Sequence, residues 1–294
     1  MRIGYNGRLE DTPQIRAGFI GCESYAFRNI YPTFQFAPVD LVAVCDLDIE
    51  RAQAFARRFG ALKAYSNHKQ MLEAEELDAV FIVVGYDADG RPLSPKIAMD
   101  CLQAGMHVWT EKPPAASVAE LEALRATAQS AGKNVVCGLK KMFFPANEKA
   151  YELMRHPDFR TRSPALLQCP QGIPPADDIA TYLQGANPGG VVGSLGHLCH
   201  PVSLFLYLLG MPCTLIYSRA ANSAGIATFQ FAGGAGASLA LTHGQTMNQG
   251  MERTVIVSDR GRHITVDNNH RVTYHKVGPV GYGDNPDFFK GGPG

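Results

Sequence analysis

The chain has 294 residues, 46% of them hydrophobic and 18% charged, and its 27 basic and 27 acidic residues give a formal net charge of zero. This composition is that of a globular protein with one or two domains, and the lack of a long basic run argues against a nucleic-acid partner. No apolar run approaches the roughly 20 residues of a membrane span, and residues 1–16 lack the apolar core of a signal peptide. We therefore expect no membrane association.

The seven cysteines are scattered along the chain without a C-x-x-C pair. Their odd number, and the apolar surroundings of most of them, argue against a disulfide framework and for a reducing compartment. A cytoplasmic location is the expectation that follows.

Residues 1–139 alternate strand and helix patterns. The predicted strands are 16–22, 41–45, 79–84, 107–110 and 134–137, and the predicted helices are 49–59, 96–103 and 117–131. The strand at 79–84 is apolar on both faces, which is typical of a parallel sheet covered by helices. Ser117 and Glu120 form a capping box, and Gly60 and Gly132 end their helices. The alternation predicts a doubly wound parallel sheet.

The pattern changes from residue 140 onward. A helix at 147–154, a loop-rich and proline-rich stretch at 156–188 and an apolar helix at 202–209 precede a series of strands. The strands are predicted at 213–218, 227–231, 237–242, 254–258, 263–267 and 271–275, with turn signals at 232–234, 259–261 and 267–269. This succession predicts an open, mostly antiparallel sheet in an α+β domain over residues 140–294.

The stretch I-G-C-E-S-Y-A at residues 20–26 stands where a dinucleotide-binding loop, G-x-G-x-x-G, is expected. Gly21 occupies the first glycine position, Glu23 the second and Ala26 the third. Asp46 ends the next strand, close to the position roughly 20 residues after the glycines where an acidic residue binds the adenosine ribose. A carboxylate there favours NAD over NADP, unless Arg51 reaches the same place. The alternative is that Asp46 caps the helix that begins near Ile49.

The stretch H-V-W-T-E-K-P-P at residues 107–114 places Glu111 and Lys112 at the end of an apolar strand. Open parallel sheets bind ligands at that end. Lys112 is suited to hold a hydroxyl or carbonyl oxygen and to assist proton transfer. The alternative is an ordinary surface loop.

These motifs, in this order, resemble the Gfo/Idh/MocA oxidoreductase family. Further matches are G-L-K-K-M-F-F-P at 138–145, Gly189-Gly190 followed by His200, and Glu252-Arg253 before the turn at 259–261. The resemblance implies an N-terminal Rossmann domain over 1–139 and a C-terminal domain over 140–294, hence an α/β fold class. It also implies an enzyme that uses NAD, with NADP as the alternative, to oxidise or reduce a sugar, cyclitol or related polyol.

The resemblance implies functional roles for particular residues of this chain. Lys112, His200 and His197 are the predicted catalytic residues, and Lys112, Lys141, His197 and His200 are the predicted substrate-binding residues. The predicted cofactor-binding residues are Gly21, Cys22, Glu23, Ser24, Tyr25, Asp46, Arg51, Val84, Gly85, Glu111 and Lys112. No metal is expected, although H-x-x-H suggests a metal pair, because no third ligand is visible nearby. A homo-oligomer, dimer or tetramer, is expected through the C-terminal sheet.

Some residues depart from the family pattern. Gly196 and Ser203 stand where aspartates flank the family's histidine, and His197, one helical turn before His200, is the substitute polar group. The alternative is that the histidines only satisfy buried hydrogen bonds. Glu23 puts a carboxylate where the pyrophosphate lies, so we expect weaker cofactor binding. Two other functions stay open: an NAD-dependent glycosidase working by transient oxidation, and a non-enzymatic ligand sensor.

Overall fold

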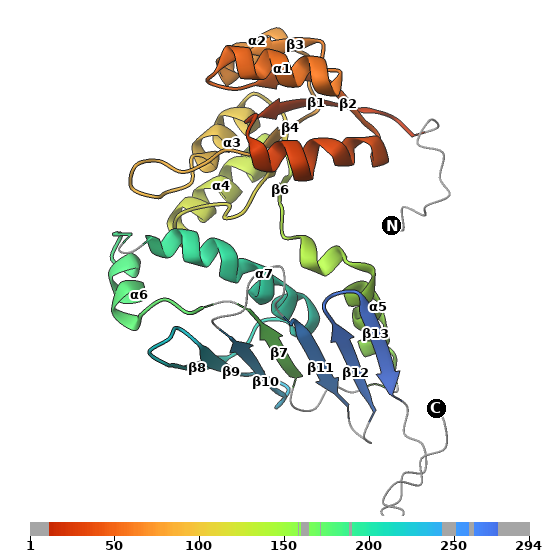
Figure 1. Cartoon of the computed structure of the whole chain (residues 1–294), viewed down its shortest axis with the longest axis vertical. Helices are drawn as coiled ribbons and strands as arrows, with labels where there is room; N and C mark the ends of the chain where they lie inside the picture. Colours follow the sequence, from red (N-terminus) through yellow and green to blue (C-terminus); the bar gives the residue numbers. More distant parts are fainter. Residues whose placement is uncertain are drawn as a thin grey trace, which may run out of the picture. The chain divides into compact units, whose positions relative to one another are not determined.

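The computed structural model describes residues 12–157, 159, 165–170, 172–187, 190–242, 251–258 and 262–275. The chain divides into two compact units, one made of residues 1–138 and 182–193, the other of residues 139–181 and 194–294. Figure 1 labels the elements of both. The turn signal at 259–261 and Gly189 of the family motif lie outside the described residues.

The first unit is built on a six-stranded parallel sheet with the order β3-β2-β1-β4-β5-β6. The strands are β1 (Ile15–Ile20), β2 (Val39–Cys45), β3 (Lys63–Tyr65), β4 (Ala79–Ile82), β5 (His107–Thr110) and β6 (Val135–Cys137). The predicted doubly wound sheet is confirmed. The order reverses between β1 and β4, which is the point where open parallel sheets bind ligands. The short β3 was not predicted.

Helices cover both faces of this sheet. They are α1 (Ile49–Phe59), α2 (His68–Ala74), α3 (Ser94–Gln103) and α4 (Val118–Ala131). Phe19 of β1 packs with Ala52 and Ala56 of α1, whereas Ile82 of β4 packs with Leu102 of α3. The apolar residues on both sides of the strands are therefore explained by two separate cores.

The predicted helix ends are confirmed by their caps. Ser117 Oγ accepts a hydrogen bond from Glu120 N at 3.2 Å, and Glu120 Oε2 accepts one from Ala116 N at 2.6 Å. Gly60 and Gly132 end α1 and α4 in the left-handed conformation, with φ of 85° and 64°. The first helical segment after β1 is irregular: a π-helix (η2, Ala26–Ile30) runs into a 3₁₀-helix (η3, Tyr31–Phe36).

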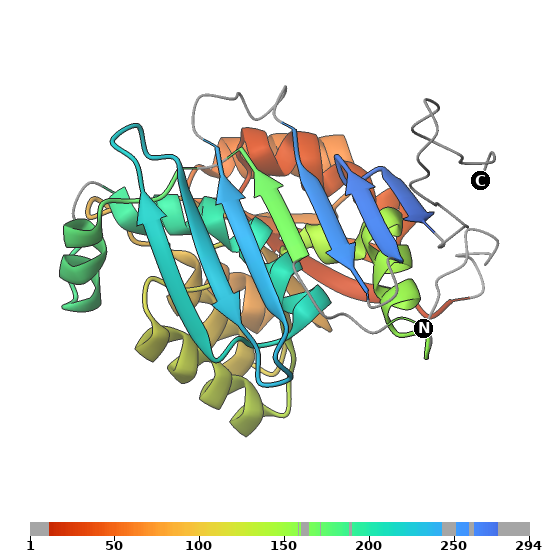
Figure 2. The same cartoon turned by 90° about the horizontal axis from the view of Figure 1, so that it is seen from below.

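The second unit is built on a seven-stranded sheet with the order β13-β12-β11-β7-β10-β9-β8 (Figure 2). The strands are β7 (Ala165–Cys169), β8 (Thr214–Arg219), β9 (Gly225–Gln230), β10 (Gly236–Leu241), β11 (Arg253–Val257), β12 (His263–Asp267) and β13 (Arg271–His275). Among the described strands of this sheet, only β7 and β10 pair in parallel. The prediction of a mostly antiparallel sheet is therefore confirmed. The turn at 267–269 is confirmed too, with Asn268 and Asn269 both at positive φ.

The prediction of a loop over 156–188 is wrong at two places. Residues 165–169 form β7, in the middle of the sheet, and residues 176–183 form α6 (Ala176–Leu183). Because β7 is a five-residue strand, its pairing with β10 and β11, rather than a local pattern, defines it.

The remaining helical elements are η4 (Lys140–Phe143), α5 (Pro145–Met154) and α7 (Val191–Leu209). The predicted helix 202–209 is too short, because α7 begins at Val191 and carries Gly193, Gly196 and Pro201, residues that disfavour a helix. By length and composition α7 is, among the described helices, the one that meets the criteria for a membrane span. This corrects the expectation that no apolar run approaches that length.

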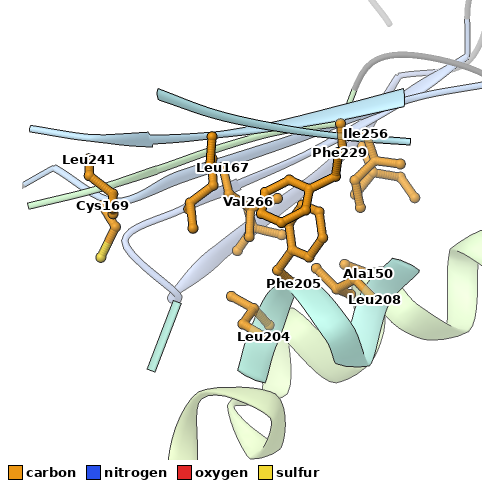
Figure 3. Close-up of a cluster of buried hydrophobic side chains, with 14 of the residues drawn as sticks. Ala150, Leu167, Cys169, Leu204, Phe205, Leu208, Phe229, Leu241, Ile256 and Val266 are labelled. Atoms are coloured by element: carbon orange, nitrogen blue, oxygen red, sulfur yellow. The ribbon is translucent and has the colours of Figure 1, made fainter. Parts of the chain in front are cut away.

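Side chains of α7 fill the core of the second unit (Figure 3). Leu204, Phe205 and Leu208 point toward Leu167 of β7 and Phe229 of β9. The rings of Phe205 and Phe229 are 4.3 Å apart, centroid to centroid. This burial identifies α7 as a core helix, with its apolar face against the sheet.

We predict that Phe205→Ala lowers the free energy of unfolding by about 3–5 kcal/mol, because the side chain is 1% exposed and its removal leaves a cavity. Met211→Ala, at a position that is 78% exposed, is the control and has an effect of about 0.5 kcal/mol or less. Urea unfolding followed by circular dichroism measures both. Equal effects of the two substitutions contradict the packing described.

Candidate functional site

Four neighbouring strands of the first unit end at the same level. Pairing aligns Ile20 with Cys45 and with Ile82, and Ile82 with Thr110. The residues that come directly after these strand ends are Gly21, Asp46, Val83 and Glu111. The topology therefore brings the glycine loop, the acidic residue and the Glu111-Lys112 pair to one edge of the sheet, beside the β1/β4 reversal.

A cleft of about 690 Å³ opens at this edge, and Gly21, Glu23, Asp46, Arg51, Val84 and Gly85 are among its lining residues. A smaller pocket of about 160 Å³ shares Glu23, Val84 and Gly85 with the cleft and adds Tyr25, Glu111 and Lys112. Nine of the residues predicted to bind a cofactor thus line one or both cavities. The other two, Cys22 and Ser24, line neither.

Gly21 is required by the backbone at the start of the loop. Its φ is +102°, and a Cβ at this position would lie 1.8 Å from the carbonyl oxygen of Val83. Only glycine combines this φ with so close an approach of the two loops. The tight turn and close backbone approach that a dinucleotide-binding loop needs are therefore present.

Asp46 holds the loop to the end of β2. Its carboxylate accepts hydrogen bonds from Cys22 N at 2.7 Å, Asp48 N at 2.9 Å and Arg51 Nη2 at 2.6 Å. Burial by itself raises the pKa of Asp46, but the hydrogen bonds from Arg51, Asp48 and Cys22 outweigh it and keep that pKa below its usual value. The alternative role, capping α1, is wrong, because Asp48 accepts from Glu50 N and Arg51 N.

Cys22 contributes its backbone rather than its thiol to this arrangement. The side chain is buried, with Sγ 3.6 Å from the hydroxyl of Tyr31. Burial raises the pKa of the thiol to about 12, so the group stays protonated at neutral pH.

Arg51 reaches the same place as Asp46. Its side chain is 41% exposed at the cleft, and the hydrogen bond to Asp46 raises the pKa of the guanidinium. The ribose end of the cleft thus presents an anion and a cation together. Arg51 was expected to weaken the preference for NAD over NADP if it reached the same place as Asp46, and it does reach that place.

Glu23 stands at the start of the first helical segment. Its carbonyl oxygen accepts a hydrogen bond from Phe27 N at 2.9 Å, and its exposed side chain lines both cavities. A carboxylate is favoured at a helix N-terminus for the same reason that a phosphate is. Glu23 therefore occupies the position from which a pyrophosphate would be bound.

The Lys112 loop is held by its neighbour. Glu111 Oε2 accepts a hydrogen bond from Lys112 N at 3.2 Å. Burial, and secondarily the Glu111 charge, raise the pKa of Tyr25 to about 12. The Glu111 carboxylate of the Lys112 loop thus lies near the phenol of Tyr25 in the glycine loop.

In the second unit, Lys141 is buried in a polar network. Its Nζ lies 2.7 Å from both carboxylate oxygens of Glu252, and Asn269 Nδ2 donates to Glu252 Oε2 at 2.6 Å. The sequence had marked Glu252 only as part of a family motif, and its pairing with Lys141 was not expected. The substrate contact of Lys141 stays a prediction.

His197 and His200 lie one turn apart on α7, the first exposed and the second half-buried. Pro201 follows His200 and removes a backbone donor from the helix there. Their catalytic roles stay predictions. Within the described part of the chain, no group of three or more His, Cys, Asp or Glu side chains is arranged to hold a metal ion.

Sequence reasoning missed the hairpin that forms the cavity wall after β4. Tyr86 and Pro92 pair as an isolated antiparallel bridge, and both line the smaller pocket. The turn residues Asp87 and Gly90 were a signal for this hairpin. Ser94, at the start of α3, lines the same pocket.

Several known oxidoreductases are similar to this chain. Residues 15–139 match the family model of the Gfo/Idh/MocA oxidoreductase family, described as having an NAD-binding Rossmann fold. The chain is 29% identical over 202 residues to D-xylose 1-dehydrogenase (NADP(+)) 2 of Haloferax volcanii, covering 66% of this chain and 57% of the relative. It is 29% identical over 140 residues to trans-1,2-dihydrobenzene-1,2-diol dehydrogenase of Mus musculus, covering 48% and 40%. The chain thus spans about half the length of these curated relatives.

Solved structures share the fold over most of the chain. A dehydrogenase from Chromobacterium violaceum matches with a TM-score of 0.75 and 23% identity, covering 90% of this chain and 75% of that one. The WlbA dehydrogenase from the same organism, in complex with NADH and UDP-GlcNAcA, matches with a TM-score of 0.72 and 19% identity, covering 92% and 80%. At these identities the likeness establishes the fold.

We predict that Asp46→Asn lowers the free energy of unfolding at neutral pH by about 1–3 kcal/mol, because a buried carboxylate with three donors is replaced. The pKa of Asp46 is depressed in the folded state, so its stabilisation is complete above the unfolded value of about 4 and is lost as pH falls through the folded value. Urea unfolding of both proteins between about pH 3 and pH 7 should show the difference shrinking in acid.

The exposed Asp40 provides the control for this prediction. Asp40→Asn should change stability by about 0.5 kcal/mol or less across the same pH range. A difference between wild type and Asp46→Asn that does not depend on pH would show that the carboxylate's charge has no part in holding the loop.

Proposed function

We propose that this chain, whose residues 15–139 match the model of the Gfo/Idh/MocA oxidoreductase family, is an NAD(P)-dependent oxidoreductase that transfers hydride to or from a hydroxyl-bearing carbon of a sugar, cyclitol or related polyol. The observation that carries the proposal is the pair of cavities at the β1/β4 reversal, with Gly21 and Asp46 at one and Lys112 at the other. The names of the xylose and dihydrodiol dehydrogenases similar to this chain support the substrate class.

The cleft fits a dinucleotide. Gly21 allows the close approach of the loop, Asp46 and Arg51 stand at the ribose end, and Val84 and Gly85 line the passage to the smaller pocket. When bound, the nicotinamide supplies hydride acceptance or donation. We propose NAD as the cofactor, with NADP as the alternative that Arg51 permits.

The chain's own residues perform the proton and positioning steps in this proposal. Lys112 holds the reacting hydroxyl oxygen as a compact cation, and Glu111 fixes the Lys112 backbone. His200, assisted by His197, takes the hydroxyl proton as general base when the substrate is oxidised. Lys141 contributes positive charge on the substrate side.

The second unit supports a proposal of self-association. Figures 1 and 2 show α5 and α7 on one face of the seven-stranded sheet, while no described element of this unit covers the other face. Leu166, Ile216 and Ile226 are 39%, 68% and 53% exposed there. We propose a dimer or tetramer formed through this face.

The seven free cysteines support the proposal of a cytoplasmic location.

We predict that Glu23→Gly tightens NADH binding about two- to tenfold, because the exposed carboxylate competes with the pyrophosphate at the start of the helical segment. Titration of the purified protein with NADH and NADPH, followed by nicotinamide fluorescence, measures the dissociation constants. Glu23→Gln is the matched variant, since it removes the charge and keeps the bulk. Unchanged or weaker binding in both variants would sink the hypothesis that Glu23 opposes the cofactor.

We predict that Lys112→Met lowers kcat/KM by about 10²–10⁴-fold, because the reacting oxygen loses its cationic partner, while the NADH dissociation constant stays within about twofold. A panel of sugars and polyols assayed for NAD(P)H formation provides the measurement. Lys149→Met, on the exposed side of α5, is the control and should leave turnover unchanged. Full activity of the Lys112 variant would remove this residue from the reaction.

One observation, the carboxylate of Glu23 at the pyrophosphate position, favours a ligand sensor as the second candidate function. A sensor binds cofactor or ligand and turns over nothing in the panel. A glycosidase that oxidises its substrate transiently retains cofactor and releases no net NADH. The same binding and turnover measurements therefore separate the three functions.

A further inference from the structure

The hairpin of residues 85–93 follows β4 and is closed by its own hydrogen bonds. Asp87 Oδ1 accepts hydrogen bonds from Asp89 N at 2.9 Å and Arg91 N at 2.8 Å, and Asp87 N donates to Arg91 O at 2.8 Å. Gly90 takes the left-handed conformation, with φ of +74°.

The hairpin forms a wall of both cavities. Gly85 and Pro92 line the cleft and the smaller pocket, Asp87 and Arg91 line the cleft, and Tyr86 lines the pocket. Any ligand that fills these cavities therefore contacts the hairpin on one side.

The other side of the hairpin holds a distant stretch of chain, residues 182–187, which we call the anchored segment. Arg91 Nη2 donates to Gly185 O at 2.5 Å, and Asn187 Nδ2 donates to Asp89 O at 2.8 Å. The hydroxyl of Tyr182 donates to Ala116 O, in the loop that follows Lys112. The anchored segment is thus tied to two of the loops that line the smaller pocket, the hairpin and the Lys112 loop.

Asn187 also forms a hydrogen bond with the start of α7. Its Oδ1 accepts a hydrogen bond from Val192 N at 2.9 Å, in the first turn of the helix. Backbone N–H groups in a first turn have no partner within the helix, so such an acceptor fixes the helix start. The two ends of one amide side chain therefore join the hairpin to α7, the helix that carries His197 and His200.

We propose that Asn187 is a positioning residue, which fixes the first turn of α7, the helix that carries His197 and His200, against the cofactor-side hairpin. The assignment of a catalytic role to His200 rests on the proposed function. The link between hairpin and helix does not, because it stands on the hydrogen bonds of the described residues. The two are therefore tested separately.

Asn187→Ala cuts the link on both sides. The alanine has neither the Nδ2 donor for Asp89 O nor the Oδ1 acceptor for Val192 N. Amide hydrogen exchange of the peptide containing Val192, in the protein without added ligand, should become about fivefold faster, as expected for the loss of one hydrogen bond. Asn222→Ala is the matched control, since Asn222 Oδ1 accepts from Ala224 N at 3.2 Å in an exposed turn, and it should leave that peptide unchanged.

Gly90→Ala tests the same contact from the hairpin. A Cβ at this residue would lie 2.9 Å from Asn187 Nδ2, and the positive φ adds strain. The peptide containing Val192 should again exchange faster, by about fivefold. Unchanged exchange in both Asn187→Ala and Gly90→Ala overturns the proposal, because the hairpin would then not fix the start of the helix.

Kinetics distinguish positioning from simple support of the fold. Asn187→Ala should lower kcat about fivefold or more, while the NADH dissociation constant stays within about twofold, because residue 187 does not line the cleft. Faster exchange with unchanged kcat limits Asn187 to a structural role and overturns the positioning. If the wild type neither binds NADH nor turns over a substrate, the proposed function fails, and the exchange measurements alone decide whether Asn187 fixes the helix.

Discussion

The Asp46 carboxylate is the interaction on which the site of the first unit depends. It stands at the end of β2 yet binds Cys22 N in the neighbouring loop, so one side chain sets the spacing between the β1 loop and the start of α1. Arg51 adds a charge-assisted bond at 2.6 Å and keeps the carboxylate ionised. The cleft keeps its form because this buried anion has donors on three sides, and an unpaired carboxylate in the same place would be costly.

The loop that Asp46 holds contains a conflict between folding and binding. Gly21 meets the demands of close packing, since any side chain would collide with Val83 O. Glu23 meets the demands of a helix start, where a negative charge is favoured, and it does so at the position that a pyrophosphate would use. In the proposed function, NAD binding follows from the fold of the loop, whereas the strength of that binding depends on Glu23. Fold and affinity are set by different residues two positions apart.

Local signals explain what could be predicted from sequence. The helix of residues 49–59 has an acidic cap before it and Gly60 after it, and the structure gives the same bounds. The stretch containing β7 has no such signal, because five residues become a strand only between two partners. The start of α7 was missed for the opposite reason, since its glycines argue locally against the helix that tertiary packing stabilises. At the site, motifs located Asp46 and Lys112, but the bonds of Asp46 to Cys22 and of Lys141 to Glu252 join residues far apart in sequence.

The anchored segment shows how such long-range bonds shape this protein. Residues 182–193 lie in the compact unit of the Rossmann sheet, although the chain on both sides of them belongs to the other unit. An unanchored loop before α7 would leave the first turn of that helix to fray, since its N–H groups lack intrahelical partners. The bonds to Asp89, Arg91 and Ala116 remove that freedom, and these partners belong to the hairpin and to the Lys112 loop, which form walls of the smaller pocket. Ordering of those walls by a ligand would consequently order the helix start as well, because the two share the same hydrogen bonds.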